Sequence, residues 1–224
     1  KCIILIKEQY FNNGDDIMKK VLLLTCLIIL IPYLIVNLFI KDDEIKFKYN
    51  NNMSVRVKQE DNDEIINVPF EEYIVGVLAG EMPVSFELEA LKAQAVAARS
   101  YVMKKMEYNK DKEYDVVDTV MNQVYLDNDH LKKAWKDDYT ENINKIKTAV
   151  LETSNQYLVY DDKVIDAMFF STSVGFTENS EEVFTSKLPY LRSVSSTWDT
   201  ISPVFEVNYT FELKEFYNKL NLDY

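Results

Sequence analysis

Residues 21–40, VLLLTCLIILIPYLIVNLFI, form a run of twenty residues without a charged side chain. As an α-helix rising about 1.5 Å per residue, such a run just spans the roughly 30 Å hydrocarbon core of a bilayer. A cleaved signal peptide is the alternative, but its apolar core would be unusually long, and no small-x-small cleavage motif follows at 36–41. The sequence therefore predicts an uncleaved, single transmembrane anchor over residues 21–40.

The charges around this run predict its orientation. Lys19 and Lys20 precede it, whereas the acidic residues 42–44 follow it, so the positive-inside tendency places the N-terminus in the cytoplasm. Met18 is a natural start, which would leave residues 1–17 as upstream sequence or as part of a small cytoplasmic tail. The predicted organisation is a cytoplasmic tail at 1–20, the anchor at 21–40, a polar stalk at 41–53 and one domain on the outer face of the cell membrane at 54–224.

Charge and residue usage exclude several classes of function for the outer domain. The net charge of -12 would repel nucleic acid phosphates, so no nucleic acid partner is expected. Cys2 and Cys26 are the only cysteines and both precede Lys41, which excludes disulfides, thiolate zinc sites and cysteine nucleophiles from the outer domain. The single histidine, His130, lies in a polar stretch and is expected at the surface, which makes a Ser-His-Asp triad a poor interpretation. We predict no metal and no cofactor.

Periodicity in the outer domain predicts an α+β fold. Alternation at 54–58 and 64–68 around 61–63 indicates a hairpin, and three- and four-residue spacing after Pro69 indicates a helix ending near Gly80. Ser85 can cap a second, alanine-rich helix from about Phe86 to Lys105. Further segments are expected to be extended at 114–125, helical at 141–153, extended at 157–160 and 164–170 around an Asp161-Asp162 turn, extended at 205–211 and helical at 212–220.

Glu81 falls at the elbow between the two predicted helices. Its neighbours are Gly80, Met82 and Pro83, an apolar setting in which desolvation would favour a protonated carboxyl group. The carboxyl end of the preceding helix acts in the same direction, and the amino end of the following helix opposes it. Glu81 is therefore a candidate general acid; the alternative is a solvated turn residue or a helix cap.

Two further groups of polar residues could bind a ligand. Lys92 and Arg99 lie seven residues apart, on one stripe of the second helix, where they could receive a substrate carboxylate or orient Glu81. They could equally be a pair of long side chains on the solvent face. The stretch 170–180 concentrates hydroxyl, amide and carboxyl groups of the kind that bind sugars, although a plain polar loop has the same composition.

Taken together, these stretches resemble the SpoIID family. The resemblance rests on VPFEEYIVGVLAGEMPVSFELEALKAQAVAARSY at 68–101, DTVMNQVY at 118–125, FFSTSVGFTENSEEVF at 169–184 and LPYLRSV at 188–194, and it covers most of residues 54–211. By this resemblance Glu81 is the catalytic residue. The residues that it places in or near a glycan cleft are Lys92, Arg99, Gln123, Ser171, Thr172, Ser173 and Glu178.

The resemblance implies a lytic transglycosylase that acts in sporulation engulfment. Such an enzyme cleaves peptide-free peptidoglycan strands between N-acetylmuramic acid and N-acetylglucosamine and leaves a 1,6-anhydro product. Implied partners are peptidoglycan glycan strands, the membrane through residues 21–40, and a sporulation complex with a wall amidase and a membrane scaffold. A non-catalytic glycan-binding or amidase-enhancing module is the alternative.

The sequence departs from the family pattern at three places. A glycine-rich GHGVGMSQ-like stretch is expected after the last residue, so the domain is predicted to be incomplete at its C-terminus. Some relatives bind zinc through His and Cys near the middle block, where this chain has Met121 and Asn122. Phe170 and Val174 stand where many members have other residues, which bears on subsite preference.

Overall fold

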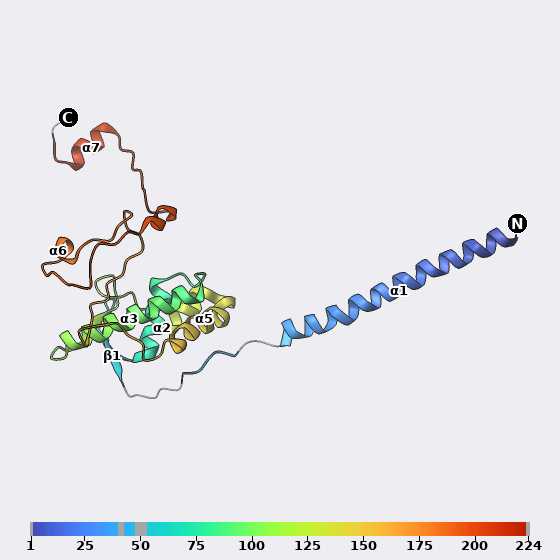
Figure 1. Cartoon of the computed structure of the whole chain (residues 1–224), viewed down its shortest axis with the longest axis horizontal. Helices are drawn as coiled ribbons and strands as arrows, with labels where there is room; N and C mark the ends of the chain where they lie inside the picture. Colours follow the sequence, from blue (N-terminus) through green and yellow to red (C-terminus); the bar gives the residue numbers. More distant parts are fainter. Residues whose placement is uncertain (1, 40–42, 48–52, 223–224) are drawn as a thin grey trace.

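The computed structural model describes residues 2–39, 43–47 and 53–222. The N-terminal helix α1 (Cys2–Phe39) projects away from the folded body (Figure 1). Within it, Ile17–Ile35 is long and apolar enough to cross a membrane and is not buried by the rest of the chain. The predicted apolar helix is confirmed, with its candidate span beginning and ending before the predicted limits. Ile40 and residues 41–42 and 48–52 of the predicted stalk lie outside the described residues, and the domain limits stay a prediction.

A small sheet supports one end of the body. Strand β1 (Ser54–Lys58) pairs antiparallel with β2 (Ile65–Pro69), with Val57 opposite Ile66, as the alternating sequence predicts. Strand β3 (Val116–Val117) lies parallel to β1 on its other edge. Val55, Val57 and Val68 point into the core, and Asp63 takes a positive φ of 63° in the hairpin turn. The mixed helix and sheet class is thereby confirmed.

Three helices form most of the core. α2 (Phe70–Glu81), α3 (Leu88–Tyr108) and α5 (Tyr139–Glu152) pack against one another (Figure 1). The buried alanines Ala95 and Ala98 allow this close packing, so the prediction that the alanine-rich helix is central is confirmed. The predicted Ser85 cap is wrong, because α3 starts at Leu88 after Glu87 in an extended conformation. A short helix, α4 (Asn128–Trp135), precedes α5 through the 3-10 turn η1 (Lys136–Asp138) and was not predicted.

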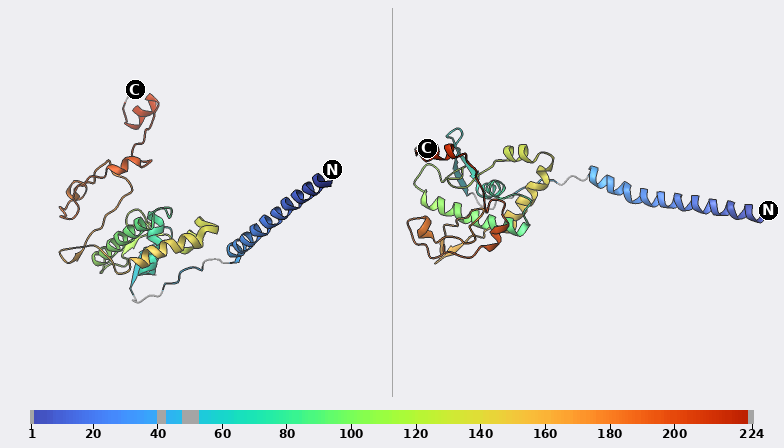
Figure 2. Two further views of the ribbon diagram at one scale, coloured as in Figure 1. Left: turned by 45° about the vertical axis from the view of Figure 1, so that its right-hand side comes forward. Right: turned by 90° about the horizontal axis from the view of Figure 1, so that it is seen from above.

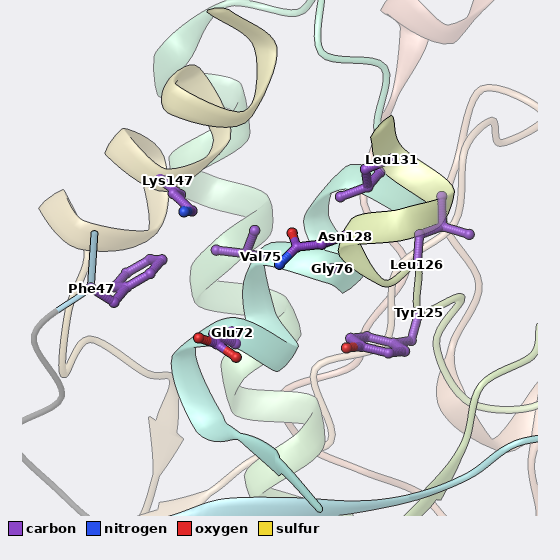
Figure 3. A pocket seen from close by; sticks show the side chains of 9 residues that line it. All are labelled: Phe47, Glu72, Val75, Gly76, Tyr125, Leu126, Asn128, Leu131 and Lys147. Atoms are coloured by element: carbon purple, nitrogen blue, oxygen red, sulfur yellow. The ribbon is translucent and has the colours of Figure 1, made fainter. Parts of the chain in front are cut away.

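Residues 43–47, which we call the strap, lie against α5. The Lys147 ammonium donates to Glu44 Oε1 and to the Ile45 carbonyl, each at 2.7 Å. The Asn144 side chain accepts from Ile45 N–H at 2.8 Å and donates to the Asp43 carbonyl at 3.1 Å. Figure 3 shows Phe47 beside Lys147, at the edge of a cavity of about 40 Å³ that α2, α4 and α5 also line. The strap is thus hydrogen-bonded to the body through Asp43, Glu44 and both backbone groups of Ile45.

The chain after α5 is built of short elements. β4 (Val159–Tyr160) and β5 (Lys163–Val164) form a hairpin around the predicted Asp161-Asp162 turn, where both residues have positive φ as a two-residue hairpin loop requires. Next come α6 (Ser180–Val183), the 3-10 helix η2 (Thr197–Ile201) and α7 (Leu213–Lys219), which lies away from the core helices (Figures 1 and 2).

Two predictions for this part of the chain have different outcomes. The predicted strand at 205–211 is wrong, because these residues form no ladder with a neighbouring strand among the described residues. An alternating sequence does not by itself supply hydrogen-bond partners for the backbone N–H and C=O groups of a strand. The predicted helix at 212–220 is confirmed as α7.

Candidate functional site

Glu81 is the last residue of α2, and the chain leaves the helix directly after it. Met82 takes an extended conformation with φ -132° and ψ 130°, as expected for the residue before Pro83. The predicted elbow between two helices is therefore confirmed, and Glu81 is half-buried within it.

A backbone donor holds the Glu81 carboxyl group. The Val124 N–H donates to Glu81 Oε1 at 2.7 Å, a short hydrogen bond across 43 residues of sequence. Val124 belongs to a segment without regular secondary structure, 123–127, that lies against α2. This contact could not be predicted from the sequence, because a backbone N–H carries no side-chain signature.

Two glycines on α2 explain how that segment can lie so close. An added Cβ on Gly80 would lie 2.7 Å from the Val124 carbonyl oxygen, and one on Gly76 would lie 2.5 Å from the Tyr125 ring. The Gly76 carbonyl also accepts from Leu126 N–H at 3.3 Å. Gly76 and Gly80 are four residues apart and so share one face of α2. We call this the glycine face; its spacing is the sequence signal that could have indicated a close backbone approach.

Gln123 lies under the site and is buried. Tyr73 Oη donates to Gln123 Oε1 at 3.2 Å, and Gln123 Nε2 donates to the Ala98 carbonyl at 3.3 Å. Burial, followed by the fields of nearby Tyr101 and Glu81, raises the pKa of Tyr73, which keeps its hydroxyl group protonated as a donor. In this structure Gln123 joins α2, α3 and the 123–127 segment.

Lys92 and Arg99 face α5. The Lys92 ammonium contacts Glu89 Oε1 at 2.7 Å and also pairs with Glu152, and these hydrogen bonds, that of Glu152 above all, raise the Lys92 pKa. Lys92 lines an open groove of about 400 Å³.

Arg99 is only 1% exposed. It donates to both Glu71 carboxylate oxygens at 3.3 and 2.9 Å and to the carbonyls of Val150 and Gln156. The solvent-face alternative is therefore wrong for Arg99. Its partner Glu71 lies ten residues before Glu81, about 15 Å along the helix, so these contacts do not bring Arg99 to Glu81.

Residues 170–180, which we call the hydroxyl loop, lie in a different part of the molecule from Glu81. Ser173 N–H donates to Asp199 Oδ2 at 2.7 Å, and Thr172 Oγ1 is 2.8 Å from Ser202 Oγ, which ties the loop to η2. Hydrogen bonds from the Ser173 side chain and backbone lower the Asp199 pKa. A hydrogen bond with Glu182 raises the Glu178 pKa.

A cavity of about 720 Å³ opens beside this loop. Thr172, Ser173 and Glu178 line it among mostly apolar neighbours, and Ser171 is not in its lining. Phe169, at its edge, packs edge-on against Tyr101 of α3, with ring centroids 6.4 Å apart. Among the contacts of the described residues, none joins this loop to Glu81.

Two other expectations concern His130 and metal binding. His130 is exposed, as predicted, and contacts the side chain of Asp127, which caps α4. Within the described ranges, no three His, Cys, Asp or Glu side chains are grouped as a metal site would need.

Known proteins match the part of the chain that contains this geometry. A family model described as "SpoIID: Stage II sporulation protein" matches residues 58–160, which include Glu81, Val124 and the glycine face. Stage II sporulation protein D of Bacillus amyloliquefaciens is 47% identical over 174 residues, and that of Bacillus subtilis (strain 168) is 44% identical over the same length. Each alignment covers 76% of this chain and 51% of the relative.

A third relative has a different description. The amidase enhancer of Bacillus subtilis (strain 168) is 41% identical over 124 residues, which are 55% of this chain and 15% of that protein. The chain spans about half the length of the sporulation proteins it matches. On the agreement of the family model with these sporulation proteins, the chain belongs to the SpoIID family.

Proposed function

We propose that this protein is a peptidoglycan lytic transglycosylase in which Glu81 is the catalytic acid and base. The observation that carries the proposal is the half-buried Glu81 carboxyl group at the α2 elbow, held through one oxygen by Val124 N–H. A positioned carboxyl group is the minimum that acid-base cleavage of a glycosidic bond requires. The family's sporulation role supports the cell wall as the setting.

The proposed reaction needs one proton carrier. Glu81 gives its proton to the oxygen that links muramic acid C1 to the next sugar, and the C1–O bond breaks. The resulting carboxylate takes the proton of the muramyl 6-hydroxyl group, whose oxygen closes onto C1 to form the 1,6-anhydro ring. The proton returns to Glu81 and no water is consumed, so a second carboxylate of the kind used by ordinary glycoside hydrolases is not needed.

Placement and binding are part of the same proposal. Residues 54–224 lie outside the membrane, with the lysines before the span on the cytoplasmic side. Lys92, at its open groove, is the proposed partner for the lactyl carboxylate of peptide-free muramic acid. The loop residues Ser171, Thr172, Ser173 and Glu178 form a more distant part of the glycan surface. Gln123 supports the site from within, and Arg99 fastens α3 to the start of α2 and to the end of α5.

The test uses denuded glycan strands and mass detection of anhydro-muramyl ends. Glu81→Gln keeps the size of the side chain but cannot give and take back a proton, so the rate should fall roughly 10²-fold or more. Folding should survive, as judged by an unchanged unfolding midpoint. Equal rates for the wild-type and Glu81→Gln proteins would refute the catalytic assignment.

A non-catalytic amidase enhancer is the second candidate, favoured by the 41% identity to a protein of that description. Adding the chain to a purified wall amidase distinguishes the two. An enhancer raises amide cleavage equally well with Glu81→Gln, whereas the transglycosylase releases anhydro ends without any amidase.

A further inference from the structure

The segment that crosses the glycine face is fixed by both α2 and α3. Gly80 and Gly76 leave no room for a methyl group between α2 and residues 124–126. Gln123 is buried between Tyr73 of α2 and the Ala98 carbonyl of α3, and Tyr125 stacks on Tyr73 with ring centroids 5.4 Å apart. Val124 lies between these two anchored residues, so its N–H has a fixed direction relative to α2.

We infer that the Val124 backbone N–H positions the Glu81 carboxyl group. We also infer that residue 80 is glycine because a side chain there would push the Val124 backbone away from α2. This rests on the proposed function. In the described part of the chain, the Val124 hydrogen bond is the only one that reaches the Glu81 carboxyl group. It engages Oε1 and leaves Oε2 for a ligand.

A carboxyl group held in this way can give and take its proton at one defined atom. Without the Val124 donor, the Glu81 side chain could rotate about its own bonds, and a displacement of about 1 Å from a reacting atom is enough to cost roughly 10²-fold in rate. The donor is part of the backbone, so no side-chain substitution at 124 removes it except proline. This makes the inference testable at a single position.

The first experiment compares Val124→Pro with Val124→Ala in the full chain in detergent micelles. Both shorten or constrain the same side chain, but only proline lacks the N–H. We expect kcat for anhydro-end release to be roughly 10-fold lower in Val124→Pro than in Val124→Ala, with similar KM. In a Glu81→Gln background the same exchange should have no further effect. Equal kcat for the two variants, or an equal loss in the Glu81→Gln background, would overturn the inference.

The second experiment does not depend on activity. Hydrogen exchange at the Val124 amide is measured in the wild-type chain and in Glu81→Ala, with the Leu126 amide as the internal control because its acceptor, the Gly76 carbonyl, is kept. Exchange at Val124 should become roughly 5- to 10-fold faster, the equivalent of one hydrogen bond, while Leu126 is unchanged. Unchanged protection of Val124 would overturn the inference.

The two experiments separate the inference from the proposed function. If the wild-type chain releases no anhydro ends but Val124 loses protection in Glu81→Ala, the catalytic function fails and the hydrogen bond stands. If Val124→Pro does not fold, Gly80→Ala replaces it, because its new methyl group must displace the Val124 carbonyl. It should then speed exchange at Val124 and lower kcat, and a Gly80→Ala chain unchanged in both would refute the inference.

Discussion

Arginine is rare in this chain. Arg56 and Arg99 each join segments that are distant in sequence, whereas Arg192 ties together residues of one stretch, 180–192. Arg56 of β1 pairs with Asp115, Arg99 of α3 with Glu71 at the start of α2, and Arg192 with Glu181 of α6. All three also donate to backbone carbonyls, which a planar group with five donors can do while it keeps its carboxylate partner. The many lysines cannot replace them in this role, because an ammonium group has no such fork.

Arg99→Lys tests whether an ammonium group can replace the guanidinium group at the most buried of the three arginines. The lysine keeps the charge but cannot reach both Glu71 oxygens and two carbonyls, so the free energy of unfolding should fall by about 2 kcal/mol. Urea unfolding of the full chain in micelles measures the change. Lys133→Arg, a swap of the same residue types at an exposed site, is the control and should have no measurable effect. An Arg99→Lys chain as stable as the wild type would show that the guanidinium fork is dispensable.

The Arg192–Glu181 pair predicts a pH dependence. The hydrogen bonds from Arg192 lower the Glu181 pKa from 4.5 to about 2. A lowered pKa in the folded state means that the pair stabilises the fold above pH 4.5 and loses this contribution as the pH falls toward about 2. The unfolding midpoint of the wild-type chain should therefore drop more between these pH values than that of Arg192→Gln, and parallel curves would contradict the prediction.

At the scale of elements, the glycine face of α2 determines how the site is assembled. Helix propensity alone would favour alanine over glycine by about 1 kcal/mol at Gly76. The Tyr125 ring and the Leu126 carbonyl, 2.5 and 2.6 Å from where a Cβ would lie, reverse that preference. The helix thus gives up some local stability so that another segment can lie against it.

Gly76→Ala should destabilise the fold by about 1–3 kcal/mol, since the new methyl group forces the 125–126 backbone away from α2. The measurement is the urea midpoint, with Ala93→Gly on the exposed side of α3 as a reference for propensity alone. A Gly76→Ala chain more stable than the wild type would mean that the 123–127 segment can move at little cost.

For the molecule as a whole, local patterns were enough to predict the elements that depend on them. The β1–β2 hairpin, the elbow at Glu81 and the Asp161-Asp162 turn follow from alternation, helical spacing and turn chemistry within about a dozen residues. The prediction of a strand at 205–211 was wrong for the opposite reason, because a strand needs a partner that its own sequence does not specify.

The site was predictable only where a side chain carries the chemistry. Glu81 could be singled out from its elbow and its neighbours, but its donor is a backbone N–H 43 residues away. Arg99 was singled out by its spacing from Lys92, yet its burial depends on Glu71 at the start of α2 and on Val150 and Gln156 at the end of α5 and just after it. Helical spacing gives the face on which a residue lies and not what covers that face.

The strap sets the length of the tether between α1 and the folded body. With Asp43 fastened to Asn144, four Cα–Cα steps lead to it from Phe39, a reach of at most about 14 Å. If the strap were released, the tether would run to Met53, fourteen such steps or about 50 Å when extended. With α1 in a bilayer, the fastened strap therefore keeps the folded body close to the membrane surface.

Lys147→Met combined with Asn144→Ala should release the strap. Energy transfer from a dye on the body to labelled lipid headgroups would then weaken as the mean distance grows, while Lys133→Met on the exposed face of α4 leaves it unchanged. Equal energy transfer in the released and wild-type chains would mean that a contact other than the strap keeps the folded body near the membrane. The same few hydrogen bonds would otherwise set how far the folded body can move from a bilayer that holds α1.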